Sequence, residues 1–121
     1  WSWSRGLGDV YKRQEDINLI TLLVAGTEPG LQVQDLDGNW HNVGCDPGAL
    51  VINSGDMLQE LSGKYFPSTT HRVINPNNKI KNKSRYSMPL FLHPKDDVVL
   101  STRYTARQYL DERLKEIGLK K

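Results

Sequence analysis

The sequence has a single cysteine, no long apolar run and no excess of one charge, and each shortage excludes a class of protein. With Cys45 alone, the chain cannot close an internal disulfide, so it needs no oxidising compartment. No apolar stretch approaches the roughly 20 residues that span a bilayer, and the first residues lack the apolar core of a signal peptide. We therefore expect a cytoplasmic protein that does not bind membranes.

The balance of charges argues against a nucleic-acid partner. Lys and Arg number 16 and Asp and Glu number 14, which gives a net charge of +2 with the signs mixed along the chain. Such a chain has no broad basic surface to attract phosphate groups. Its length of 121 residues is enough for at most one domain with a workable core.

Short apolar stretches separated by turn residues indicate a mainly β fold. The stretch 17–24 is almost continuously apolar, which predicts a strand covered on both faces. A short helix is expected over 57–61, ended by Gly63, and a longer one over 105–117, capped by Thr105 and ended by Gly118. Further strands are expected over 31–34, 39–43, 49–53, 69–75 and 85–92.

Two short motifs carry the chemistry. His71 is a residue type that commonly binds metals, and it lies in the expected strand 69–75. Arg85 and Ser87 follow in another strand, where alternate residues share a face. A guanidinium beside a hydroxyl suits a carboxylate, which it holds by parallel charge-assisted hydrogen bonds. Upstream, Asp16 stands at the start of the apolar run 17–24 and could meet His71 in space.

With these residues, the chain resembles the isopenicillin N synthase-like branch of the iron(II)- and 2-oxoglutarate-dependent oxygenases from about Glu15 to the C-terminus. Linked motifs in the right order carry the resemblance, at residues 15–16, 28–33, 37–40, 47–56, 68–73 and 85–89. The resemblance implies a double-stranded β-helix, or jelly roll, with a C-terminal helix. Because the chain supplies fewer strands than the roughly eight of a full jelly roll, we expect a fold that is incomplete at its N-terminus.

The resemblance also implies a role for each site residue. Asp16 and His71 would be metal ligands for Fe(II), and no catalytic residue is expected beyond the metal ligands. Arg85 and Ser87 would bind the far carboxylate of the cosubstrate 2-oxoglutarate, with dioxygen as the other reactant. Asn53 would buttress the site. The family carries a His two residues before the Asp, whereas this chain has Gln14, a doubtful metal position because an amide oxygen is a weaker, neutral donor.

The first fourteen residues differ in character from the rest. Residues 4–14 resemble translated sequencing-adapter sequence, and the segment has no initiating Met and no sustained hydrophobic period. We therefore divide the chain into an artefactual head (1–14), a partial oxygenase core (15–104) and a C-terminal helix with its tail (105–121). On this interpretation the parent chain carried His at position 14. The alternative is a natural Gln variant.

The expected function follows from the resemblance. The chain would be the C-terminal part of an oxygenase that hydroxylates, desaturates or cyclises a small molecule while 2-oxoglutarate is decarboxylated to succinate. The alternative is a catalytically inactive β-helix fragment whose iron site is defective at Gln14. A cupin-like metal or sugar binder fits less well, because the sequence lacks the His-rich ligand cluster typical of such proteins.

Overall fold

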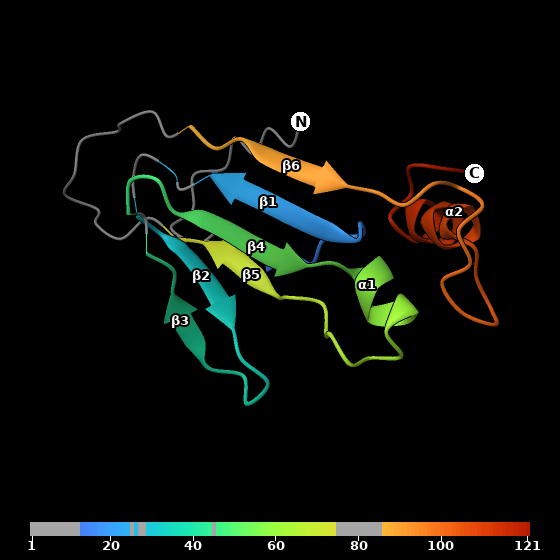
Figure 1. Ribbon diagram of the computed structural model, residues 1–121, viewed down its shortest axis with the longest axis horizontal. Coiled ribbons are helices and arrows are strands. Elements are labelled where there is room, and N and C mark those ends of the chain that lie inside the picture. Colours follow the sequence, from blue (N-terminus) through green and yellow to red (C-terminus); the bar gives the residue numbers. More distant parts are fainter. Residues whose placement is uncertain (1–12, 25, 27–28, 45, 75–85) are drawn as a thin grey trace.

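The computed structural model describes residues 13–24, 26, 29–44, 46–74 and 86–121 (Figure 1). Strands predominate in the first part of the chain and a helix closes it, so the mainly β prediction with a C-terminal helix is confirmed. In chain order the elements are β1 (Ile20–Val24), β2 (Leu31–Gln34), β3 (Trp40–Asn42), β4 (Leu50–Ser54), α1 (Asp56–Leu61), β5 (His71–Val73), β6 (Pro89–Leu92) and α2 (Ala106–Glu116).

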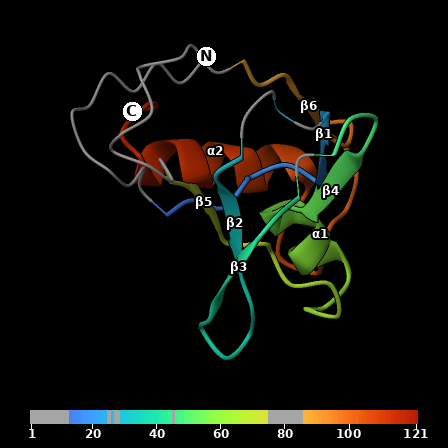
Figure 2. The same cartoon turned by 90° about the vertical axis from the view of Figure 1, so that its left-hand side faces the viewer.

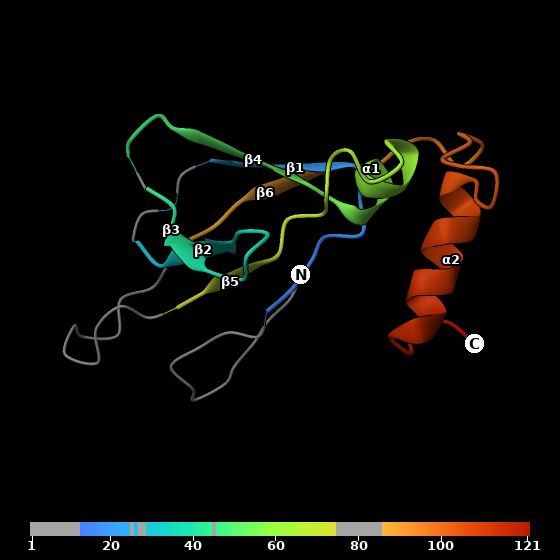
Figure 3. The same ribbon diagram turned by 90° about the horizontal axis from the view of Figure 1, so that it is seen from below.

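The strands form two antiparallel sheets, which Figure 3 shows as two layers. One sheet has the order β4-β1-β6 and the other β3-β2-β5. In the first, Thr21 pairs with Asn53, and in the second, Val33 pairs with His71. Because side chains alternate between the two faces of a strand, paired residues share a face. This register decides which side chains face the space between the layers.

The first strand begins three residues later than expected. Backbone carbonyl groups of residues 17–19 accept hydrogen bonds from the start of α1: Gly55 N–H donates to Leu19 O at 2.9 Å, and Met57 N–H to Asn18 O at 3.2 Å. Of this segment, Leu19 also reaches a strand, since its N–H donates to Leu92 O of β6 at 3.0 Å. The last strand begins at Pro89, and residues 75–85, where part of two expected strands falls, lie outside the described residues.

The buried apolar residues of the described chain gather at one end of the sheets. Met57 of α1 packs with Ala106 and Tyr109 of α2 and with Leu100, all at most 6% exposed. The helix α2 runs crosswise to the strands at this end (Figures 1 and 2). Thr105 caps it as expected, accepting a hydrogen bond from Gln108 N. Neither helix found among the described residues is long and apolar enough to cross a membrane.

One face of the sheet β4-β1-β6 is apolar and open to solvent. The register places Leu22 opposite Ile52 and Leu90, which are 61% and 62% exposed. The prediction that the first strand is covered on both faces is therefore wrong in this structure, because only the face bearing Thr21 looks toward the second sheet. We call the exposed side chains of this surface the outer apolar face; they are Val24, Leu50, Ile52, Leu90 and Leu92.

Candidate metal site

Backbone pairing brings residue 14 beside His71. Gln14 N–H donates to His71 O and His71 N–H donates to Gln14 O, both at 3.0 Å, which forms an isolated antiparallel bridge at the edge of β5. The opposite edge of β5 pairs with β2. Directly paired residues of antiparallel strands present their side chains on the same face. Accordingly, Gln14 Nε2 lies 3.1 Å from His71 Nε2.

Asp16 lies where the chain crosses from this edge to the other sheet. Its carbonyl oxygen accepts a hydrogen bond from Asp56 N–H at 2.7 Å, which ties the crossing to the start of α1. Its Oδ1 is 3.8 Å from His71 Nε2, and the side chains of Asp16 and His71 are 14% and 12% exposed. The structure thus brings together Gln14, Asp16 and His71, the three residues that the sequence singled out for metal binding.

One hydrogen bond fixes the ring of His71. Its Nδ1 lies 3.0 Å from the carbonyl oxygen of Thr69. A carbonyl can only accept, so the proton of the neutral ring sits on Nδ1 and leaves the lone pair on Nε2. That nitrogen faces Asp16 Oδ1. This is the tautomer that a metal-binding imidazole adopts when its other nitrogen donates to a backbone carbonyl.

Two donors fix the carboxylate of Asp16. Thr21 Oγ1 donates to Asp16 Oδ2 at 2.6 Å, and Asn53 Nδ2 donates to the same oxygen at 2.8 Å. Oδ1 is left to face His71. Asn53 makes the contact expected of a buttress, whereas Thr21 was not singled out from the sequence. A polar residue inside an almost continuous apolar run was the available signal, because a buried hydroxyl needs a partner.

Gln14 occupies the lone pair that a metal would use. Since His71 Nε2 carries no proton, Gln14 Nε2–H donates to it. Within the described ranges, no group of three or more His, Cys, Asp and Glu side chains is placed to hold a metal ion. The donor set fits a divalent cation through one carboxylate and one imidazole, and an amide stands in the third place. Turning the terminal amide by half a revolution would present its oxygen instead.

Charges of both signs act on the carboxyl group of Asp56, which follows Gly55 at the start of α1. Burial is the main reason that the pKa of Asp56 is raised; the negative charges of Glu15 and Asp16 raise that pKa further, and the positive charge of Arg113 lowers it. Thr70 Oγ1 donates to Glu15 Oε1 at 2.6 Å, which draws that side chain toward β5. A positive ion beside Asp16 would offset the negative charge of that carboxylate.

Of the two residues expected to bind 2-oxoglutarate, the structure describes Ser87, whereas Arg85 lies outside the described residues. Ser87 is exposed and stands two residues before Pro89, the first residue of β6. Phe91 pairs with Thr21 and Pro89 with Leu23, so the odd-numbered residues of β6 face the second sheet. Continuing that alternation would put Ser87 on the same side as Asn53.

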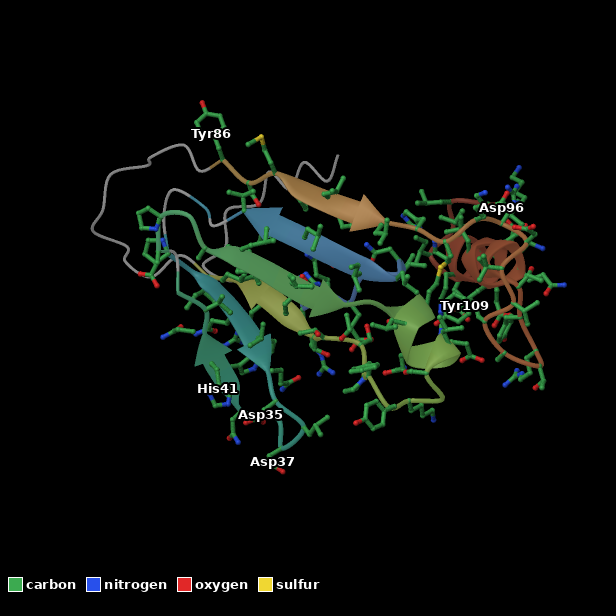
Figure 4. The ribbon with its side chains drawn as sticks, in the orientation of Figure 1. Asp35, Asp37, His41, Tyr86, Asp96 and Tyr109 are labelled. Atoms are coloured by element: carbon green, nitrogen blue, oxygen red, sulfur yellow. The ribbon has the colours of Figure 1, made fainter. Side chains whose placement is uncertain are left out.

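A second polar cluster lies on the hairpin between β2 and β3, where Figure 4 labels Asp35 and His41. His41 Nε2 is 2.6 Å from Asp35 Oδ2, and the His41 side chain is 58% exposed. This bond is the main reason that the pKa of Asp35 is lowered to about 2, and the backbone N–H of Asn39 lowers it further. The cluster organises the hairpin turn and contacts none of Gln14, Asp16 and His71.

Residues 9–94, more than half of the chain, match the model of one family, the 2OG-Fe(II) oxygenase superfamily. The chain belongs to this superfamily. Among its curated relatives, oxidoreductase vrtI of Penicillium aethiopicum is 36% identical over 88% of this chain and 27% of its own length. The 2-oxoglutarate-dependent dioxygenase 11 of Oryza sativa is 38% identical over 77% of this chain and 28% of its own.

Solved structures of superfamily members confirm the double-stranded β-helix fold. A protein of Shewanella oneidensis described as a candidate oxygenase has a TM-score of 0.84 and 54% identity, covering 98% of this chain and 44% of that one. A protein of Neurospora crassa, solved in complex with alpha-KG and thymine, has a TM-score of 0.72 and 25% identity, covering 88% of this chain and 37% of that one.

Membership of the superfamily implies Fe(II) as the metal and 2-oxoglutarate and dioxygen as cosubstrates. The chain spans less than a third of the length of these curated relatives. The divisions expected after residues 14 and 104, and the role of each site residue, stay predictions.

Proposed function

We propose that this chain carries the iron- and 2-oxoglutarate-binding residues of an oxygenase that oxidises a small organic molecule. The observation that carries the proposal is the meeting of Asp16 Oδ1 with His71 Nε2 at 3.8 Å, each side chain being fixed through its other polar atom. One carboxylate oxygen and one imidazole nitrogen on the same side are two of the three ligands of the facial arrangement used by non-haem iron oxygenases.

Each residue then has a defined task. Asp16 and His71 would hold Fe(II), whose role when bound is to activate dioxygen for oxidative decarboxylation of 2-oxoglutarate and oxidation of the substrate. Arg85 would grip the far carboxylate of 2-oxoglutarate, and Ser87 would add a hydroxyl donor. Together these groups would orient the cosubstrate at the metal. Hydroxylation, desaturation and ring closure are the outcomes open to such a site.

A second candidate is favoured by the hydrogen bond from Gln14 Nε2 to His71 Nε2. As placed, the amide supplies no ligand and covers the lone pair of the imidazole, so the chain as written would bind iron weakly. On this alternative the polypeptide is an inactive member of its superfamily. The two candidates differ in what happens when residue 14 is replaced.

The test compares Gln14→His with Gln14→Leu and the chain as written. Leu removes the amide from His71 Nε2 without adding a ligand, so it isolates the effect of uncovering the lone pair. That hydrogen bond is worth about 1 kcal/mol, or roughly fivefold in affinity. Loss of an outer partner of a metal ligand costs about 10- to 100-fold, and a direct ligand should matter at least as much. We expect Fe(II) affinity to rise in the order Gln, Leu, His.

The activity measurement is succinate formation from 2-oxoglutarate with Fe(II) and oxygen, which proceeds slowly in such enzymes even without the native substrate. Gln14→His should form succinate, and adding Arg85→Ala should raise the KM for 2-oxoglutarate by removing its carboxylate partner. Circular dichroism establishes that each variant is folded. Absence of both iron binding and succinate from folded Gln14→His would contradict the oxygenase proposal and favour the inactive candidate.

A further inference from the structure

The carboxylate of Asp16 is oriented by a chain of hydrogen bonds that begins at a buried amide. Asn18 is 1% exposed and Thr21 is 4% exposed, which makes them two of the most buried polar residues described. Asn18 Nδ2 lies 2.9 Å from the carbonyl oxygen of Ile20 and 3.0 Å from Thr21 Oγ1. A buried amide at such a position persists only when its polar atoms have partners.

The direction of these bonds follows from what each atom can donate. The Ile20 carbonyl only accepts, so the atom of Asn18 that faces it is the NH₂ group. The same NH₂ group donates its other proton to Thr21 Oγ1. The hydroxyl has one proton of its own, and two acceptors lie within reach: Asp16 Oδ2 at 2.6 Å and Asn18 Oδ1 at 3.4 Å. The shorter, charge-assisted bond to Asp16 takes the proton.

We propose that Asn18 and Thr21 are positioning residues, which fix the carboxylate of Asp16 so that Oδ2 is occupied and Oδ1 is presented to the metal. The inference rests on the proposed function, since it assigns a task toward the cation that Asp16 and His71 would hold. Asn53 is the second donor to Oδ2 and also helps to hold the carboxylate of Asp16 in this orientation. With that oxygen satisfied twice, the carboxylate resists rotation, and Oδ1 stays beside His71 Nε2.

The arrangement has a structural support. A methyl group built at Gly55 would overlap the carbonyl oxygen of Asn18 and lie 2.6 Å from its Oδ1. Gly55 N–H donates to Leu19 O at 2.9 Å, so the backbone of residue 55 is held against the Asn18 turn. The amide that starts the hydrogen-bond chain therefore lies close to the backbone at the start of α1, which leaves no room for a side chain at residue 55.

The test replaces the hydroxyl of Thr21 in the full chain and in its Gln14→His form. Thr21→Val keeps the shape and removes the donor, while Thr21→Ser keeps the donor and serves as the matched control. Affinity for Co²⁺ is measured by titration calorimetry, and thermal unfolding is followed separately. We expect Val to weaken Co²⁺ binding by about 10- to 100-fold, the usual effect of removing a partner of a metal ligand, and Ser to stay within about threefold of the parent.

A merely structural Thr21 would lower the unfolding temperature without changing Co²⁺ affinity of the folded protein. Equal affinity in folded Thr21→Val and its parent would overturn the proposal, as would a Ser variant as weak as the Val variant. If Thr21→Val does not fold, Asn53→Ala decides the question, because it removes the other donor to Oδ2 from a half-buried position: weaker Co²⁺ binding supports the proposal and unchanged binding rejects it. Absence of Co²⁺ binding in the Gln14→His parent itself would contradict the proposed function and this inference together.

Discussion

At the scale of single residues, hydrogen bonds to one polar atom of each side chain fix the orientation of His71 and Asp16. His71 bonds its Nδ1 to Thr69, and Asp16 bonds its Oδ2 to Thr21 and Asn53. Asp16 Oδ1 and His71 Nε2 are then left to face each other, and Gln14 Nε2 donates a hydrogen bond to the imidazole nitrogen. A ligand fixed in this way loses little conformational entropy when a cation binds, which is how pre-organisation raises affinity.

The hairpin cluster gives a prediction at the same scale. In the folded chain Asp35 should titrate near its lowered pKa of about 2 and not near the ordinary 3.8, mainly because it bonds to His41. A lowered folded pKa means that the ionised group stabilises the turn above pH 4, and that this stabilisation is lost as the pH falls from about 4 toward 2. The carboxyl ¹³C shift of Asp35, followed by NMR, measures the midpoint.

His41→Ala is the matched variant for this titration. It removes the first cause of the shift and leaves the bond from the backbone of Asn39. The Asp35 midpoint should rise toward 3.8 while that of the distant Asp111, whose pKa is lowered mainly by its bond to Lys120, stays unchanged. An Asp35 midpoint that does not move in His41→Ala would show that the imidazole is not its main partner.

The sequence singled out Asp16, His71 and Gln14, and the structure places the three together. What the sequence did not supply was Thr21, because its importance depends on which atom receives one hydroxyl proton. Residue type says that a hydroxyl can donate and accept, and only the distances of 2.6 Å to Asp16 and 3.4 Å to Asn18 decide between them.

At the scale of elements, the start of α1 is packed against residues 17–19 with almost no space between the backbones. Gly55→Ala should therefore destabilise the fold by about 1–3 kcal/mol or more, since the backbone of Asn18 must shift to make room for the new methyl group. The shift of Asn18 should also weaken metal binding in the Gln14→His background. Chemical denaturation gives the first quantity and Co²⁺ titration the second.

Gly44→Ala is a matched control for this change. A methyl group there would meet nothing nearer than an Asp46 side-chain oxygen at 3.4 Å, and Gly44 does not adopt a positive φ. We expect it to alter the free energy of unfolding by less than about 0.5 kcal/mol, as is usual for surface substitutions. If both variants lose a similar amount of unfolding free energy, the close approach of Gly55 to Asn18 is not the cause of the loss.

Elements with local signals were predicted well. The helix expected over 105–117 is found at Ala106–Glu116. It could be predicted because the residues that start and end it, Thr105 and Gly118, lie directly beside it in the sequence. Residues 17–19 were expected to be strand and instead form bends that bond to Gly55 and Met57. Apolar pattern alone cannot distinguish a strand from a segment whose backbone partners lie almost forty residues later.

At the scale of the whole molecule, the outer apolar face is the largest departure from a well-covered fold. Ile52 and Leu90 are 61% and 62% exposed and share one face with Leu22. Contiguous apolar surface of this kind promotes association in water. Leu90→Lys should therefore reduce self-association of the chain, with lower apparent mass in light scattering at high concentration and little change in secondary structure.

Leu36→Lys makes the same chemical change at an isolated site. Leu36 is 90% exposed at the hairpin turn, away from the sheet β4-β1-β6, so its replacement alters net charge equally without touching the outer apolar face. Only Leu90→Lys is expected to lower the scattering mass. An equal reduction in both variants would assign the effect to charge and not to that face.

The bridge between Gln14 and His71 is made by main-chain atoms alone. Side chains placed at residue 14, apart from proline, which lacks the N–H that the bridge uses, are therefore expected at the same point beside Asp16 and His71. Different side chains at position 14 would suit different metals: a thiolate soft metals, a carboxylate hard ones and an imidazole those in between. On the proposed function, a single substitution at residue 14 would change which metal the site prefers, while the surrounding strands stay as they are.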